Sequence, residues 1–103
     1  MASWVNGGRA DTLSPGKVRV VFGARERLAV CNVDNTFYCI SDVCTHDGAS
    51  FDTAELDGNE IECPRHGARF DVTDGHVTCM PAVVPVKTYP VRIENGEIHI
   101  QVD

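Results

Sequence analysis

The 103-residue sequence predicts an all-β fold, an antiparallel β-sandwich or barrel built mainly from hairpins. Short runs rich in β-branched residues recur along the chain, and Asp-Gly and Asn-Gly pairs separate several of them. No stretch of about 12 residues combines helical periodicity with capping residues. A chain of this length forms one domain, residues 1–103, with a modest hydrophobic core.

The first strands are expected within the N-terminal 41 residues. Residues 7–16 contain paired glycines and end in a Pro15-Gly16 turn, so we expect a surface loop there. Apolar and β-branched residues then predict three strands, at 17–22, 27–33 and 36–41. Asp34-Asn35 would form the turn between the last two.

Three further pairs mark hairpins in the second half of the chain: Asp57-Gly58, Asp74-Gly75 and Asn95-Gly96. Both residues of such a pair tolerate the positive φ that tight hairpin turns require. In the last hairpin, apolar residues alternate with polar ones over 91–102. One face of that hairpin is therefore expected to be buried.

Residues 42–82 are richer in turns, acids, cysteine and histidine than the rest of the chain. We expect them to form a subdomain of loops and hairpins inserted into the main β unit. The segment from Asp42 to Asp74 contains nine acids and two bases. It is therefore more negative than the whole chain, whose net charge is −6. That charge disfavours nucleic acid as a partner. The acidic segment is either a transient docking face for a basic partner or an ordinary set of polar loops.

The sequence also argues against a membrane span and a disulfide framework. It has no apolar run near about 18 residues and no secretory signal, so we expect a cytoplasmic protein outside the membrane. Five cysteines are an odd number for paired disulfides. Cys31, Cys39 and Cys79 are expected to be small buried hydrophobic residues, and His76 and His99 to be solvated without a role.

The other two cysteines stand close to histidines, in the pairs Cys44-x-His46 and Cys63-x-x-His66. Two thiolates and two imidazoles can hold a transition metal. Structural zinc is one interpretation, although zinc fingers place both cysteines in one turn and both histidines on one helix. A Cys-His nucleophile is a second, although it requires only one pair. A two-iron, two-sulfide cluster is a third, in which each loop gives a ligand to each iron.

Gly48 and Gly67 follow the two pairs closely. If a cluster is bound, a side chain at either position would obstruct the approach of backbone N–H groups to its sulfurs. We therefore expect glycine at both positions for reasons of space.

With these motifs, the sequence resembles a Rieske protein, specifically a soluble Rieske-type ferredoxin. The resemblance rests on "CTHDGA", a gap of sixteen residues between the two Cys-His pairs, and "CPRHGARFD" followed by "TDG". It covers nearly the whole chain from about Lys17 and implies a Rieske-type sandwich or barrel with a cluster-binding subdomain at 42–82. Pro81 would lie in a third loop that covers the cluster.

The resemblance implies a [2Fe-2S] cluster with Cys44 and Cys63 on one iron and His46 and His66 on the other. The imidazole edges of the two histidines would be the electron exit. The implied function is that of an electron carrier, not an enzyme, which takes electrons singly from a flavin-dependent ferredoxin reductase and passes them to a terminal oxygenase. A terminal oxygenase itself would need a much larger catalytic domain. Two alternatives stay open: the small subunit of a nitrite reductase or another oxidoreductase, and a redox-sensing module.

The resemblance also implies a reduction potential toward the low end of the Rieske range, roughly −150 to 0 mV. High-potential relatives join the two ligand loops by a disulfide, and this chain has Ala49 and Arg65 at those positions. Such relatives also have a Ser and a Tyr that hydrogen-bond at the cluster, where this chain has Ala68 and Phe70. Hydrogen bonds to the sulfurs stabilise the more negative reduced state, so their loss lowers the potential.

Overall fold

The computed structural model describes residues 3–23, 25–45, 48–65 and 67–102, and its regular structure is almost entirely β-strand. The strands are β1 (Ser3–Arg9), β2 (Val18–Gly23), β3 (Glu26–Val33), β4 (Thr36–Ser41), β5 (Leu56–Asp57), β6 (Glu60–Glu62), β7 (Arg69–Asp71), β8 (Val77–Cys79), β9 (Thr88–Tyr89), β10 (Val91–Glu94) and β11 (Glu97–Val102). Within these ranges the helical content is a single 3₁₀ turn, η1 (Ala10–Thr12). None of the described residues belongs to a helix long and apolar enough to cross a membrane. The all-β prediction is confirmed.

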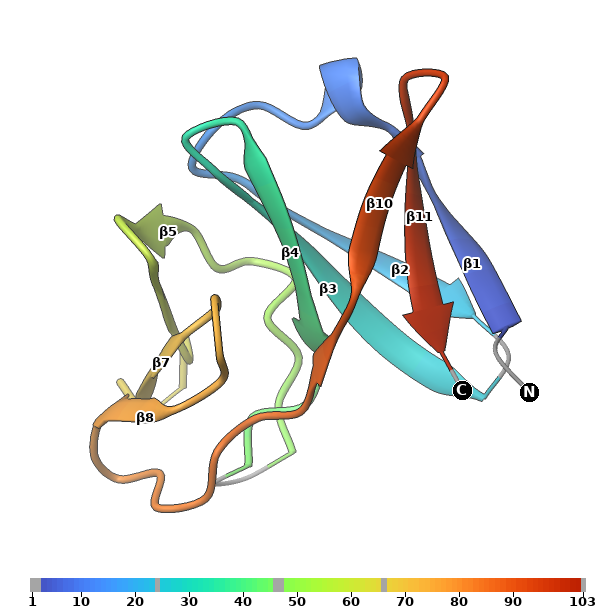
Figure 1. The fold of residues 1–103 in the computed structure, drawn as a ribbon. Helices are drawn as coiled ribbons and strands as arrows, with labels where there is room; N and C mark the ends of the chain where they lie inside the picture. Colours follow the sequence, from blue (N-terminus) through green and yellow to red (C-terminus); the bar gives the residue numbers. More distant parts are fainter. Residues whose placement is uncertain (1–2, 24, 46–47, 66, 103) are drawn as a thin grey trace.

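The strands form three antiparallel sheets (Figure 1). The first has the order β1-β11-β10, so the N-terminal strand completes a sheet with the C-terminal hairpin. The second has the order β2-β3-β4-β9, and the third has the order β5-β6-β7-β8. The third sheet falls within residues 42–82, but the assignment of that whole segment as a cluster-binding subdomain stays a prediction.

Strand β3 runs through the middle of the molecule and is buried on both faces. Leu28 and Val30 pack in a core with residues of the first sheet. Ala29 and Cys31 point the other way and pack in a second core with residues of the third sheet. A strand covered on both faces has a continuous apolar run instead of strict alternation, which explains the sequence "LAVC" here.

Two of the four predicted turns are present as expected, and Asp74-Gly75 lies within a longer connection, residues 72–76, between β7 and β8. Asp34-Asn35, with φ of 52° and 70°, joins β3 to β4, and Asn95-Gly96, with φ of 54° and 77°, joins β10 to β11. In the last hairpin, Val91 lies opposite Ile100 and Ile93 opposite Ile98, which is the expected register. The β5–β6 turn lies one residue later than expected, at 58–59.

The loop predicted for residues 7–16 is wrong in its first part, because β1 continues to Arg9. This strand pairs with β11, and its register shifts between Asn6 and Arg9, where one extra residue forms a bulge. A Cβ on Gly7 would lie 3.1 Å from side-chain atoms of both Ile98 and Ile100. The glycine therefore marks a close approach between neighbouring strands, not a flexible loop.

The three cysteines outside the Cys-His pairs divide into two kinds. Cys31 and Cys39 are buried as predicted, and burial raises the pKa of both thiols, to about 12 for Cys31. The prediction for Cys79 is wrong, because it lies exposed at the end of β8. All five cysteines lie in the described part of the chain, and no disulfide joins any of them.

Candidate metal centre

The two Cys-His segments form loops that close in the same way. In the first cysteine loop (Cys44–Ala49), the cysteine N–H donates to the alanine carbonyl (2.8 Å) and the Gly48 N–H donates to the cysteine carbonyl (2.7 Å). In the second cysteine loop (Cys63–Ala68), the cysteine N–H donates to the alanine carbonyl (2.7 Å) and the Gly67 N–H donates to the cysteine carbonyl (3.1 Å). The repeated Cys-His pairing in the sequence therefore corresponds to a repeated backbone structure.

Glycine is required in both loops by backbone conformation. Gly48 has φ of +79° and Gly67 has φ of +81°, a region that side-chain-bearing residues rarely adopt. A Cβ built on Gly48 would meet no protein atom within 4 Å, and one on Gly67 would meet only Glu62 Oε2, at 3.7 Å. The protein itself leaves room for a side chain, so the expected role of these glycines in admitting N–H groups to cluster sulfurs stays a prediction.

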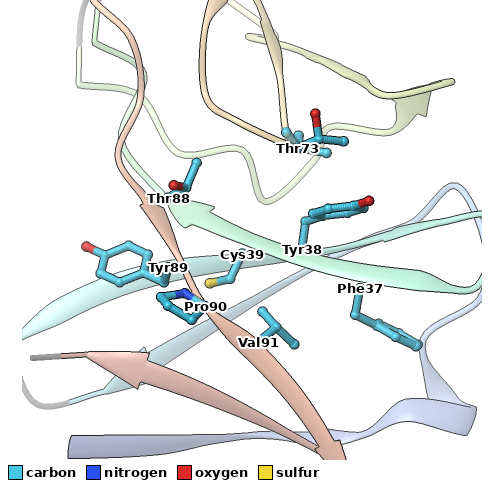
Figure 2. Close-up of a pocket in the computed structure, with 9 residues that line it drawn as sticks. Phe37, Tyr38, Cys39, Thr73, Thr88, Tyr89, Pro90 and Val91 are labelled. Carbon is cyan, nitrogen blue, oxygen red and sulfur yellow. The ribbon is translucent and has the colours of Figure 1, made fainter. Parts of the chain in front are cut away.

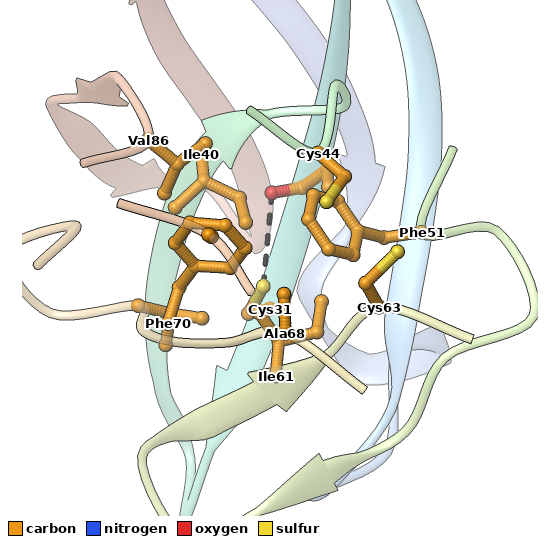
Figure 3. Packing of buried hydrophobic residues seen from close by; sticks show 12 residues of the cluster. Cys31, Ile40, Cys44, Phe51, Ile61, Cys63, Ala68, Phe70 and Val86 are labelled. Atoms are coloured by element: carbon orange, nitrogen blue, oxygen red, sulfur yellow. Dashed lines mark hydrogen bonds between the residues drawn. The ribbon is translucent and has the colours of Figure 1, made fainter. Parts of the chain in front are cut away.

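The structure places the two predicted cysteine ligands in one apolar cluster, between the second and third sheets. Cys44 and Cys63 are each 1% exposed, and Figure 3 shows both at the same end of the cluster, beside the ring of Phe51. That ring packs edge-to-face on Phe70, with centroids 5.9 Å apart and ring planes at 84°. The two thiols therefore lie in a dry setting that the first and second loops build together.

The two predicted histidine ligands, His46 and His66, lie outside the described residues. Their loops are nevertheless described on both sides, from Cys44 to Thr45, from Gly48 to Ala49 and on either side of position 66. The four-residue ligand set therefore stays a prediction from the sequence and its resemblance.

The base of the first cysteine loop rests on two charged side chains that the sequence analysis did not single out. Asp42 is fully buried, and its carboxylate accepts hydrogen bonds from the Ser50 hydroxyl (2.6 Å) and the Phe51 N–H (2.7 Å). Arg27 Nη2 donates to the Asp42 carbonyl (2.8 Å). The available signal was an acid placed directly after an apolar strand and two residues before a candidate ligand.

The base of the second cysteine loop is instead a backbone ladder. Strands β6 and β7 flank the loop and pair directly, with Glu62 opposite Arg69, Ile61 opposite Phe70 and Glu60 opposite Asp71. This loop is thus the connection of a hairpin, and main-chain hydrogen bonds hold its ends together.

A third loop (residues 80–87) lies against the first. The Thr45 hydroxyl donates to the Val84 carbonyl, at 2.6 Å. Ala82 and Val86 are buried in the same apolar cluster as the two cysteines, and Met80, Val83 and Val84 remain exposed. This arrangement brings the segment that contains Pro81 next to the first cysteine loop.

The acidic segment is partly neutralised within the structure. Arg69 lies among three acids: Nη2 is 2.8 Å from Asp57 Oδ2, Nε is 2.9 Å from Glu60 Oε1, and Nη1 is 3.8 Å from Glu62 Oε1. The hydrogen bond that Arg69 donates to the Asp57 carboxylate is the main cause of the raised pKa of Arg69. Because Asp42 is buried, it is not part of any acidic surface.

Two other features carry no comparable chemistry. Asp71, Asp74 and His76 offer ligand atoms within 4.8 Å of one another, but His76 is already paired with Asp74 at the surface. A pocket of about 340 Å³ lies between β4, residues 88–91 and residues 72–73 (Figure 2). The pocket is lined by aromatic and aliphatic side chains, by tyrosine and threonine hydroxyl groups and by the thiol of the buried Cys39. No described residue of the three loops lines it.

The described residues fit a bound iron–sulfur group. A mixed-ligand two-iron cluster needs a thiolate from each of two facing loops, with an imidazole next to each. Two buried cysteines in two matched loops meet that need, and each loop sequence carries one histidine. Finger-type zinc binding would not require such matched loops.

The sequence and fold resemble those of known proteins along nearly the whole chain. A family model described as a Rieske [2Fe-2S] domain matches residues 3–90. The ferredoxin component of the naphthalene 1,2-dioxygenase/salicylate 5-hydroxylase systems of a Ralstonia species is 35% identical over 101 residues, which cover 98% of this chain and 97% of that protein.

Solved structures agree with this match. In a complex of reduced oxygenase and oxidised ferredoxin in carbazole 1,9a-dioxygenase, the matching chain has a TM-score of 0.90 and 37% identity, over 94% of this chain and 91% of that one. A ferredoxin of Sphingomonas yanoikuyae B1 has a TM-score of 0.91 and 33% identity, over 98% and 100%. An NADH-dependent nitrite reductase small subunit from Mycobacterium tuberculosis, at 22% identity and a TM-score of 0.88 over 100% of this chain and 97% of that one, shows a shared fold alone.

Proposed function

This chain belongs to the Rieske [2Fe-2S] domain family, and from that premise we propose that it is the ferredoxin of an oxygenase system. It transfers electrons, as do the ferredoxin components that it matches over nearly their full length. The observation that carries the proposal is the pair of identically closed loops that bury Cys44 and Cys63 at one end of a single core cluster.

Cys44 and Cys63 are proposed to bind one iron of the cluster, and His46 and His66 the other. The matched loops support this assignment, because each loop supplies one thiol and one imidazole in the same order. A cluster ligated in this way accepts and releases one electron at a time.

The protein's own contribution is a rigid and dry seat for the ligands. Both cysteines are almost fully buried, and the Phe51–Phe70 pair packs the space next to them. A close-packed apolar setting resists rearrangement when the charge of a bound group changes. The same ligand geometry can then serve both oxidation states, which favours fast electron exchange.

The reduction potential is proposed to lie toward the low end of the Rieske range, roughly −150 to 0 mV. Ala68 and Phe70 are both fully buried and bring no hydroxyl group to the site. Ala49 and Arg65 occupy the positions where a loop-to-loop disulfide would require cysteines. A midpoint above about +200 mV would contradict this proposal.

The proposed partners are a flavin-dependent reductase as electron donor and a terminal oxygenase as acceptor. The latter is supported by the solved complex that contains a ferredoxin similar to this chain. Docking is proposed at the loop end, where exposed Met80, Val83 and Val84 adjoin the first cysteine loop. The remaining exposed acids of residues 42–74 would steer a basic partner toward it. We place the protein in the cytoplasm, where reducing conditions suit cysteines that form no disulfide.

A role as nitrite reductase small subunit is the second candidate, because such a subunit shares the fold. Its identity to this chain is 22%, whereas ferredoxin components exceed 30%. A free carrier is therefore favoured. Among the described residues, no particular contact supports a redox-sensing function.

The test is catalytic turnover with limiting protein. A small amount of the purified protein should support many cycles of oxygenase activity when a flavin reductase and NADH supply electrons. The rate at subsaturating concentration should fall as ionic strength rises, because acidic steering is screened by salt. Permanent co-purification with a large subunit, without turnover in the oxygenase assay, would overturn the carrier function.

A further inference from the structure

Asp42 is a fully buried carboxylate that has no place in the proposed ligand set. A buried carboxylate is costly unless hydrogen bonds compensate it. Here both oxygens are used, since Oδ1 accepts from the Phe51 N–H at 2.7 Å and Oδ2 accepts from the Ser50 hydroxyl at 2.6 Å. The hydrogen bonds of this side chain therefore serve a local structural purpose.

These hydrogen bonds join the two ends of the first cysteine loop. Asp42 directly follows β4, whereas Ser50 and Phe51 come directly after the loop. The next strand begins only at Leu56, so no pair of flanking strands closes this loop. The side chain of one residue spans the gap that a β-ladder would otherwise close.

Arg27 braces the same loop from the neighbouring strand, β3. Its Nη2 donates to the Asp42 carbonyl at 2.8 Å and, over a longer 3.4 Å, to the Gly48 carbonyl within the loop. Its Nε lies 3.7 Å from Asp42 Oδ2. The backbone completes the contact, because the Asp42 N–H donates to the Arg27 carbonyl at 2.9 Å.

We propose that Asp42 and Arg27, the Asp42–Arg27 clamp, are positioning residues that fix the first cysteine loop relative to the second. In this way they set where Cys44 presents its thiolate. The inference rests on the proposed function in one respect, that this loop carries a cluster ligand. Loss of the clamp frees the first loop while the hairpin that holds the second loop stays intact.

Graded variants separate positioning from charge. Asp42→Ala removes the bridge, whereas Asp42→Asn removes the charge but keeps an acceptor for the Phe51 N–H. Arg27→Lys keeps the charge and Arg27→Met removes it, while both lose the planar fork of donors. The matched control is Glu62→Ala, which removes an exposed acid directly before Cys63, where a ladder holds the loop.

The measurements are the rate of cluster loss from the oxidised holoprotein to an iron chelator, the midpoint potential and the reduced electron-paramagnetic spectrum. We expect Asp42→Ala to lose the cluster about tenfold faster or more, since it forfeits hydrogen bonds to a charged acceptor. Its potential should shift and its spectrum should broaden. Asp42→Asn should show smaller changes of the same kind, and Glu62→Ala should stay within about twofold of the wild type.

A wild-type rate, potential and spectrum in Asp42→Ala would overturn the proposal, and so would equal effects in Asp42→Ala and Glu62→Ala. If Asp42→Ala yields no holoprotein, the same measurements are made on Ser50→Ala and Arg27→Met. Wild-type rates, potentials and spectra in both variants would overturn the proposal.

Hydrogen exchange of the Phe51 amide distinguishes a failure of this proposal from a failure of the proposed function. A wild-type protein without iron would end the proposed function, yet faster exchange of that amide in Asp42→Ala would still support the clamp. Unchanged exchange would count against the clamp alone.

Discussion

The two cysteine loops close in the same way but differ at their bases. Each closes through the same two backbone hydrogen bonds and contains a glycine with φ near +80°. The second loop rests on the β6–β7 ladder, which is made of backbone groups. The first rests on Asp42 and Arg27, which are side chains. The two loops thus close in the same way on different supports. Only the support of the first loop depends strongly on the identity of its side chains.

Substitutions at the equivalent cysteines and glycines of the two loops should therefore have equal consequences for the cluster. Substitutions at the bases should matter much more in the first loop than in the second. Variants of the cysteines and glycines test this equivalence, and variants of the Asp42–Arg27 clamp test the difference between the bases.

The largest effect is expected at the cysteines. Cys44→Ala and Cys63→Ala should each abolish the cluster, because each removes a proposed thiolate ligand of the same iron. Cys79→Ala is the matched control, since that cysteine is exposed at the end of β8 and should be dispensable. Iron and acid-labile sulfide analysis with visible absorbance measures the outcome. A full cluster in either loop variant would break the proposed symmetry.

The aromatic pair that joins the loops comes next. Phe51→Ala and Phe70→Ala should each lower the free energy of unfolding by about 3–5 kcal/mol, because both rings are fully buried and would leave cavities. The double variant should reveal a coupling of about 0.5–1.5 kcal/mol from the edge-to-face contact. Denaturant titration followed by circular dichroism measures both quantities. Strictly additive losses would mean that the two rings do not support each other.

A smaller effect is expected at the glycines. Gly48→Ala and Gly67→Ala should each cost about 1–2 kcal/mol of stability, because alanine must adopt a left-handed backbone. Gly16→Ala is the control, since Gly16 has φ of +83° and open space around a Cβ, as Gly48 does. All three variants should lose similar stability, but only the loop variants should alter the spectrum of the cluster. An altered spectrum in Gly16→Ala would show that the effect is not local.

The smallest effect concerns the surface pair of His76 and Asp74, near the second loop's sheet. The hydrogen bond to Asp74 raises the pKa of His76 above its ordinary 6.5. The same pair lowers the pKa of Asp74 below its ordinary 3.8, so its contribution to stability is fully present between pH 3.8 and 6.5 and is lost as pH rises through the raised pKa of His76 or falls through the lowered pKa of Asp74. Both side chains are exposed, so His76→Gln should change the pH profile of stability only slightly. Titration of the imidazole by NMR measures the pKa, and a value below 6.5 would contradict this account.

Local signals in the sequence predicted much of the fold. The turns at Asp34-Asn35 and Asn95-Gly96 and the register of the last hairpin depend on neighbouring residues, so the pattern was sufficient. Strand β1 was missed because its partner, β11, lies at the opposite end of the chain. Its paired glycines look like a loop until the side chains that pack over Gly7 are known.

The sequence indicates candidate ligands but not the groups that support their loops. The spacing of Cys44, His46, Cys63 and His66 is visible in the sequence. Asp42 was counted with the surface acids, because burial cannot be judged from a polar stretch alone. Arg27 reaches the loop only because β3 and β4 lie side by side, which is a tertiary relation. Cys79 was misplaced for a similar reason, since a short strand at a sheet edge can leave its last residue exposed.

We propose that two matched loops hold one mixed-ligand [2Fe-2S] cluster. The most direct test is the visible and electron-paramagnetic spectra of the purified protein before and after dithionite, with metal analysis of the same sample. We expect about two irons per chain and a signal that appears on reduction and differs from that of all-cysteine clusters. His46→Cys and His66→Cys should each move that signal toward the all-cysteine type or lose the cluster. A colourless protein that contains one zinc and gives no signal on reduction would exclude a [2Fe-2S] cluster at this site.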